Sequence, residues 1–166
     1  MVAAKYSPQG DQITTATPGF VRVWDSNDGC SLKHIPVMVI PQYNTGLLWS
    51  NNLLFVLSNR KIKQFEVPTG SAISEWPVPE SNPYSCITLP KHGKFITCTT
   101  LHTVTFWDVA THTQLGLIEH SQDIGSFALS PDGRCLAICR EDGKITVNTL
   151  SRIAVHILLL DCGAYE

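Results

Sequence analysis

The sequence has no excess of charge of either sign. Its 166 residues include 12 Lys and Arg against 14 Asp and Glu, a formal net charge of −2, and like charges do not gather in blocks. Proteins that bind nucleic acid usually carry a basic patch or stripe, so we expect no nucleic-acid partner. Hydrophobic residues make up 43% of the chain, which is enough apolar surface for a folded domain rather than a disordered one.

Long apolar runs are also missing. A membrane helix needs about 20 consecutive apolar residues, whereas no apolar run here approaches that length, including the one near residues 157–160, next to His156. Residues 1–10 contain neither the basic start nor the apolar stretch of a secretory signal. We therefore expect no membrane association and a cytoplasmic location.

The cysteines and histidines form no motif with metal-ligand spacing. None of the six cysteines lies in a Cys-x-x-Cys pair, and the six histidines show neither HxxxH nor HExxH spacing. Cys135 and Cys139 are four residues apart in an apolar stretch. An incomplete metal site is one interpretation of this pair, and two small buried hydrophobic side chains are the favoured one. We expect no metal, no cofactor and free thiols, as in a reducing compartment.

The sequence also contains no recognisable set of catalytic residues. Enzymatic use of a histidine needs a nucleophile and an orienting acid beside it. His120, Ser121 and Asp123 are close in sequence, but a structural hydrogen-bonding role suits His120 better. Asp123 and Asp142 are a second pair of interest, although glycosidase chemistry depends on a carboxylate separation that sequence does not fix. We expect no catalytic residue and no enzyme; the alternative is an enzyme or small-ligand binder whose acids converge only in the fold.

What the sequence does contain is a repeat. Trp24, Phe65, Trp107 and Asn148 are spaced 41, 42 and 41 residues apart, and we call these four the ladder residues. A β-branched residue precedes each by three positions, and an acid follows the first three, with Thr149 after the last. Such regular spacing predicts four structural repeats of about 41 residues.

Turn-forming clusters divide each repeat into short apolar runs of strand length. One set of turns precedes the second strand, at residues 7–10, 50–52, 89–93 and 130–133, and another follows the ladder residue. The outermost strands are predicted at residues 31–35, 72–76, 114–118 and 153–158. The predicted fold is all-β: a single β-propeller domain over residues 1–166, with four-stranded antiparallel blades at about 2–40, 41–81, 82–122 and 123–162.

The Trp24-Asp25 and Trp107-Asp108 dipeptides resemble the signature of WD-repeat proteins. His120 stands ten residues before Ser130-Pro131-Asp132-Gly133, as in that family, and Asp142-Gly143 matches its turn before the third strand. The resemblance implies structural roles for the ladder residues and for His120 and Asp142.

Family blades often carry an Asp-His-Ser/Thr-Trp hydrogen-bond set, and no blade of this chain has all four members. The third blade has Trp107 with Thr97 but Leu101 in place of the Asp, and the fourth has Ile138 in the hydroxyl position.

A finer likeness lies near the end of the chain. Four short segments are similar in sequence to the terminal repeats of basidiomycete fungal WD proteins: residues 112–115, 128–133, 143–147 and 150–153. Many of those are attached to NACHT-type, NLR-like signalling switches. The chain has no GxxxxGK(S/T) nucleotide-binding run, so the resemblance implies only a recognition or sensor module.

The favoured function is a non-catalytic protein-interaction scaffold that presents loops on rigid strands. The contact loops are expected before the first and third strands of each blade, with Tyr43, Arg60, Tyr84 and His102 as the partner-binding residues, because Tyr and Arg are common anchors. Trp76, in an outer strand, is a further candidate for a partner contact, whereas Trp49 is expected in the core. The alternative is a purely structural role in which the chain only completes a larger ring.

Four blades cover about half of a ring of the usual WD size, about seven blades. An open half-ring would leave two sheet faces bare, and we expect those faces to be lined by Ile13, Val21, Val23, Leu136, Ile138 and Val147. Two copies could close an eight-bladed ring as a homodimer. A compact four-bladed ring and a fragment of a longer propeller are the alternatives.

Thiol titration tests the expected reducing compartment. Under denaturing, non-reducing conditions we expect six free thiols, one for every cysteine in the sequence. A count of two or four would show disulfide bonds and would contradict the cytoplasmic location.

Overall fold

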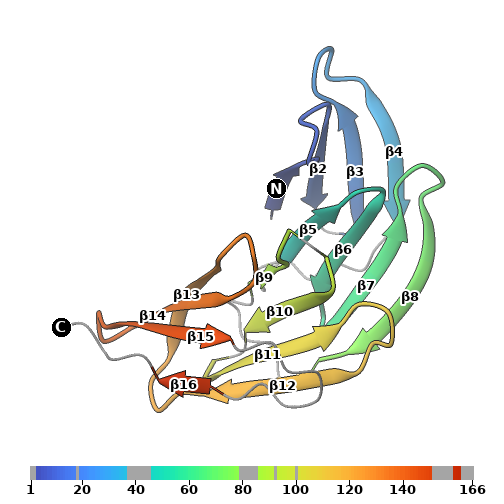
Figure 1. The fold of residues 1–166 in the computed structure, drawn as a ribbon. Coiled ribbons are helices and arrows are strands. Elements are labelled where there is room, and N and C mark those ends of the chain that lie inside the picture. The colour runs from blue at the N-terminus through green and yellow to red at the C-terminus, as the bar shows by residue number, and fades with distance from the viewer. Residues whose placement is uncertain are drawn as a thin grey trace. The chain divides into compact units, whose positions relative to one another are not determined.

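The structure is a computed structural model that describes residues 3–17, 19–36, 46–78, 86–91, 93–99, 101–150 and 159–161. The chain divides into two compact units, Met1–Ser85 and Cys86–Glu166. Each unit contains two antiparallel four-stranded sheets whose strands follow one another in chain order (Figure 1).

Unit 1 holds the first and second sheets. Their strands are β1 (Ala3–Tyr6), β2 (Gln12–Thr17), β3 (Phe20–Asp25) and β4 (Ser31–Pro36), then β5 (Gly46–Ser50), β6 (Leu53–Ser58), β7 (Lys61–Glu66) and β8 (Ser71–Pro77). Unit 2 holds the third and fourth sheets. Their strands are β9 (Ile87–Thr88), β10 (Phe95–Thr99), β11 (Thr103–Asp108) and β12 (Gln114–Glu119), then β13 (Ile124–Leu129), β14 (Cys135–Arg140), β15 (Ile145–Leu150) and β16 (Leu159–Asp161).

These sheets confirm the predicted fold class: the chain is all-β, with four four-stranded antiparallel blades. No helix occurs among the residues that the structure describes. The outermost strand of the fourth sheet differs from the prediction, because β16 pairs Leu159–Asp161 with β15. The strand predicted at residues 153–158 lies outside the described residues.

Ser-Pro-x-Gly turns join the first and second strands as predicted, in the first and fourth sheets. In the first sheet the Ser7 hydroxyl donates to Asp11 at 2.7 Å and accepts from the Gln12 amide at 3.0 Å. Gly10 closes the turn with its amide on the Ser7 carbonyl, at a φ of +78°. This left-handed backbone suits glycine because a Cβ would be strained there.

The ladder residues occupy equivalent places in the third strand of each sheet. The paired residues on the second strand are Ile13 for Trp24, Leu54 for Phe65, Ile96 for Trp107 and Leu136 for Asn148. Each of these partners is the second residue of its strand. The four-fold repeat is therefore confirmed.

The register also defines two faces for every sheet, because side chains alternate along a strand. We call the side that carries the ladder residue the ladder face and the other side the opposite face. In unit 1 one core combines Ala16, Val21, Val23 and Ile35 from the opposite face of the first sheet with Leu47, Trp49, Leu54, Val56 and Phe65 from the ladder face of the second. The core of unit 2 is built in the same way. It joins Val104, Phe106 and Ile118 of the third sheet to Ile124, Leu136, Ile138 and Leu150 of the fourth.

This packing corrects the expected bare faces. Val21, Val23, Leu136 and Ile138 are all 0% exposed and lie inside the two cores, so they line no bare face. Alternation in sequence shows which residues share a side, but not which side meets a neighbouring sheet.

The two tryptophans outside the ladder are both buried. Trp49 is 7% exposed, as expected for a core residue. Trp76 is 5% exposed and lies edge-on to Phe55, with ring centroids 6.5 Å apart. The predicted partner contact at Trp76 is therefore wrong, because this side chain is not accessible.

Truncation of a core residue tests the packing of unit 2. We expect Phe106→Ala to lower the free energy of unfolding by about 3–5 kcal/mol, since Phe106 is 0% exposed. The control Leu117→Ala, in the same sheet but 45% exposed, is expected to change it by less than about 0.5 kcal/mol. Urea unfolding followed by tryptophan fluorescence measures both; equal losses would contradict this core.

Candidate functional site

Backbone hydrogen bonds connect three neighbouring loops of unit 2. They are residues 101–102 before β11, residues 120–123 before β13 and residues 141–144 before β15. The His120 and Ile124 amides donate to the His102 and Leu101 carbonyls, both at 2.8 Å, and the Glu141 amide donates to the Asp123 carbonyl at 2.9 Å. We call these three loops the turn platform. They include three of the four loops on which sequence reasoning expected partner contacts in the third and fourth blades. The remaining one, residues 82–84, lies outside the described residues.

An imidazole–carboxylate pair crosses the platform from one sheet to the next. His102 Nδ1 lies 3.1 Å from Asp123 Oδ1, and the two side chains are 51% and 36% exposed. Because the backbone on both sides is already fixed, this pair is held in place while its outer edges remain open to solvent. It presents one imidazole and one carboxylate to an approaching molecule.

The third loop is rigid for a related reason. The carboxylate of Asp142 accepts hydrogen bonds from the Arg140 guanidinium and from the Lys144 amide at 3.1 Å. The Arg140 side chain is the main cause that lowers the pKa of Asp142 below its ordinary value. Gly143 closes the loop at a φ of +84°. Glu141 is exposed beside this turn, and it adds a carboxylate to the platform.

The predicted partner-binding residues are only partly described. His102 lies on the turn platform, whereas Arg60 lies in the β6–β7 turn of unit 1 and is exposed. Asn59 and Arg60 both have positive φ, 52° and 60°, and the Arg60 carbonyl accepts from the Val78 amide at 2.9 Å. Tyr43 and Tyr84 lie outside the described residues. Binding by any of the four stays a prediction.

Sequence reasoning named Asp123 and Asp142 but did not connect Asp123 with His102, nor Arg140 with Asp142. The first pair joins residues of two different sheets, which no local pattern indicates. The second pair spans one tight turn, and the opposite charges two residues apart were a signal that could have found it.

The tryptophans of the ladder bond within their own sheets. Trp24 Nε1 donates to Thr15 Oγ1 at 2.8 Å, from the neighbouring strand. Trp107 Nε1 donates instead to Thr105 Oγ1 at 3.1 Å, two residues earlier on its own strand. The family resemblance grouped Trp107 with Thr97 in one hydrogen-bond set, but Thr97 pairs with Phe106 in the register and so points to the other side of the sheet.

The remaining structural candidates are partly buried or paired. Phe65 and Asn148 are 4% and 3% exposed, which places both in the interior. The Asn148 Nδ2 atom has no hydrogen-bond partner among the described residues, a cost that a Phe at this ladder position would not incur. His120 contributes its backbone amide to the platform, and Asp142 is paired with Arg140.

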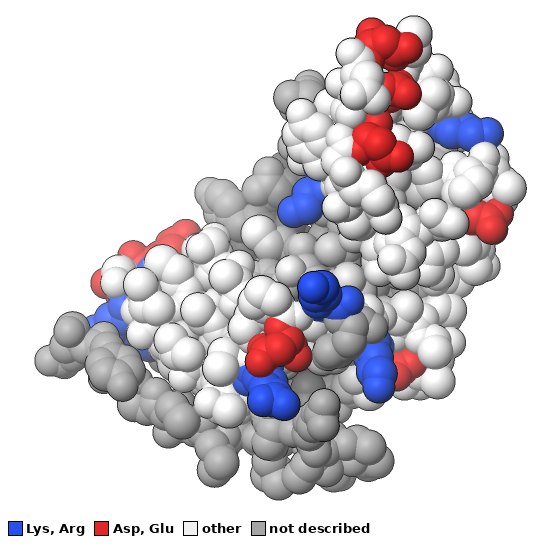
Figure 2. Space-filling view, turned by 45° about the horizontal axis from the view of Figure 1, so that its top comes forward, with Lys and Arg blue, Asp and Glu red and all other residues white. Residues whose placement is uncertain are grey.

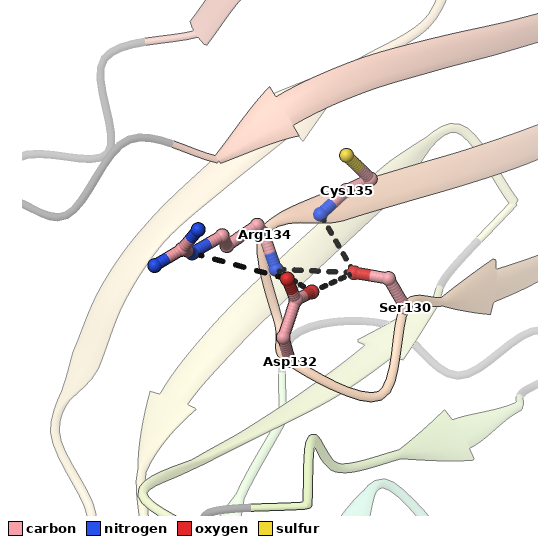
Figure 3. Close-up of polar contacts among 4 residues, drawn as sticks. All are labelled: Ser130, Asp132, Arg134 and Cys135. Carbon is pink, nitrogen blue, oxygen red and sulfur yellow. Dashed lines mark hydrogen bonds and ion pairs between the residues drawn. The ribbon is translucent and has the colours of Figure 1, made fainter.

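The turn after β13 shows how the Ser-Pro-Asp-Gly motif fixes a reversal (Figure 3). Ser130 Oγ donates to Asp132 Oδ1 at 2.7 Å and accepts from the Cys135 amide at 2.8 Å. Asp132 also accepts from the Arg134 amide at 3.0 Å. The Ser130 hydrogen bond is the main cause that lowers the pKa of Asp132.

Charge is mixed on the surface. On the face shown in Figure 2, basic and acidic side chains are interspersed, and no extended basic patch is visible. The described residues include no group of three or more His, Cys, Asp and Glu side chains that could hold a metal ion. Within the same ranges, no helix has the length and hydropathy needed to cross a membrane. Cys30, Cys86, Cys135 and Cys139 are free thiols.

A known family matches the part of unit 2 that carries most of the platform. Residues 112–147 match the WD domain, G-beta repeat family. The matched segment runs from the turn before β12 to β15 and includes His120, Asp123, Arg140 and Asp142. Together with the four blade-like sheets, this match supports a WD-repeat β-propeller, as the Trp-Asp dipeptides indicated.

A solved structure has a similar fold. It is a chain in the crystal structure of the mitotic checkpoint complex, with a TM-score of 0.71 and 18% sequence identity over 88% of this chain. This chain covers 49% of that one and so spans about half its length. At this identity the likeness concerns the fold alone. A search of curated proteins finds no match to the sequence.

Acid titration tests the Ser130–Asp132 turn. Because the folded pKa of Asp132 is lowered, its contribution to stability is present above its unfolded pKa of about 3.9 and is lost as the pH falls through the folded value. We expect Asp132→Asn to be less stable than the wild type at pH 7, and the difference to shrink below about pH 4. Urea unfolding at a series of pH values measures it. A difference that stays constant down to acid pH would contradict the assigned role.

Proposed function

We propose that the chain is a non-catalytic WD-type scaffold and that the turn platform of unit 2 is its protein-binding surface. The observation that supports this most directly is the exposed His102–Asp123 pair, which lies on loops tied together by backbone hydrogen bonds. A surface fixed in this way loses little conformational freedom when it binds, which favours recognition.

The charges of the platform suggest the chemistry of the partner. Arg140 is engaged by Asp142, whereas Glu141 is exposed and Asp123 keeps an exposed edge beside His102. These two carboxylates are therefore the ones that a partner can reach. Leu101, 37% exposed, adds an apolar contact beside them. We propose a partner segment that presents Lys or Arg side chains next to an apolar residue, because complementary charge steers association and fixes register.

The finer predictions from the sequence remain proposals. A role as the recognition part of a fungal NLR-like signalling protein is supported only by the sequence similarity of residues 112–115, 128–133, 143–147 and 150–153. The cytoplasmic location and the homodimer are likewise proposals. The purely structural, ring-completing role is the main rival, and it predicts that substitutions on the platform change no binding event.

Charge reversal on the platform distinguishes these two functions. A partner captured from the native source with the intact chain would be identified, purified and titrated by calorimetry. We expect Asp123→Lys and Glu141→Lys each to weaken its binding at least about tenfold, with a reduced dependence on salt. Gln114→Lys, which adds a positive charge at the far end of β12, is the control and should bind like the wild type. Equal affinity for all four proteins would contradict the platform as the binding surface.

A further inference from the structure

Two of the sheet faces outside the cores of the two units carry the most exposed large hydrophobic side chains. The first is the ladder face of the first sheet, where the register places Ala4, Tyr6, Ile13, Phe20, Arg22 and Trp24. The second is the opposite face of the fourth sheet, with Ala128, Ala137, Ile145 and Val147. Tyr6 is 61% exposed and Ile145 is 54% exposed, the two highest values among the exposed large hydrophobic residues of the described chain.

The same positions are buried wherever a sheet face is covered within a unit. On the ladder face, Tyr6 corresponds to Trp49 of the second sheet, since each pairs with the residue opposite its ladder residue. Trp49 is only 7% exposed. On the opposite face, Ile145 corresponds to Val21 and Val104, which are both 0% exposed. The two bare faces thus carry the same kinds of side chain as the buried faces, but no neighbouring sheet within their unit covers them.

The side chains of the two bare faces also have complementary sizes. In unit 1 an opposite face of small residues, Ala16, Val21 and Val23, packs on a ladder face of large residues, Trp49, Leu54 and Phe65. The fourth sheet again offers a small-residue opposite face, and the first sheet again offers a ladder face with large aromatic residues. This chain therefore carries both partners of an interface that it already builds within unit 1.

Arg22 lies at the centre of the ladder face of the first sheet. Its charge is compatible with another sheet packing on that face. Its Cζ atom lies 4.7 Å from the Phe20 ring centroid and 5.6 Å from that of Trp24, so the aromatic rings stabilise the cation. In the covered second sheet the corresponding residue is also a cation, Lys63, which pairs with Glu75 at 3.4 Å. A cation at this position therefore coexists with a packed ladder face.

We infer that the opposite face of the fourth sheet packs on the ladder face of the first sheet in a second copy of this chain. Every copy supplies one face of each kind, so two copies related by a two-fold axis cover all four faces through two identical junctions. This surface is separate from the turn platform, because the platform is built from loops and the junction from sheet faces.

Solution mass of the whole chain is the first test. Sedimentation equilibrium at micromolar concentration is expected to give twice the chain mass of 18.3 kDa. We expect Tyr6→Glu and Ile145→Glu each to weaken dimerisation at least about a hundredfold, because each would bury a carboxylate among the apolar side chains of the junction. Both residues are exposed in the single chain, so neither change should disturb folding, and circular dichroism verifies this. Ile73→Glu, at an exposed position of β8 that belongs to neither face, should leave the mass unchanged.

Mixing the two variants tests which faces meet. A pair made of one Tyr6→Glu copy and one Ile145→Glu copy keeps one junction between unaltered faces, so an equimolar mixture at high concentration should regain dimers that neither variant forms alone. A single-chain mass for the wild type would overturn the inference, since the faces would then be bare or covered within one chain. So would a dimer that either variant leaves intact, or a mixture that stays monomeric. The platform variants Asp123→Lys and Glu141→Lys should lose partner binding but keep the dimer mass. The proposed function and the dimer can therefore fail independently of each other.

Discussion

The structure depends on one packing rule: the opposite face of one sheet lies against the ladder face of the next. It is seen in both units, between the first and second sheets and between the third and fourth. The rule follows from the two-residue period of a strand, which sorts each sheet into two sides. Burial of apolar side chains between such sides is the main favourable contribution to folding. The hydrogen-bonded turns, Ser7–Asp11 and Ser130–Asp132 among them, then hold each strand in register.

The same rule accounts for the rigidity of the turn platform. Sheets packed face to face bring their strand ends side by side, and the loops at those ends can then exchange backbone hydrogen bonds. The His120 and Ile124 amides on residues 101–102 and the Glu141 amide on Asp123 are bonds of this kind. The His102–Asp123 pair is a consequence of that proximity. Function on such a protein is expected on loops, because strands fix their positions.

Much of the fold could be predicted because its signals are local. The spacing of Trp24, Phe65, Trp107 and Asn148 predicted four equivalent third strands, and Pro-Gly clusters predicted most of the turns between strands. The faces could not be assigned in the same way. Val21 and Leu136 were expected on bare faces but lie in cores, because alternation says nothing about which side meets a neighbour. Thr97 was grouped with Trp107 in the family's hydrogen-bond set, but its pairing with Phe106 places it on the other side of the sheet. The His102–Asp123 contact joins two sheets and had no signal in either segment alone.

A double-mutant cycle between Val23 and Leu54 tests the packing rule most directly, because these residues belong to different sheets and share the core of unit 1. If the two faces pack together, the losses in unfolding free energy for Val23→Ala and Leu54→Ala should be non-additive by about 0.5–3 kcal/mol. A matched cycle between Val23 and Leu136, which lie in the cores of different units, should be additive within about 0.5 kcal/mol. Additivity in both cycles would contradict the account.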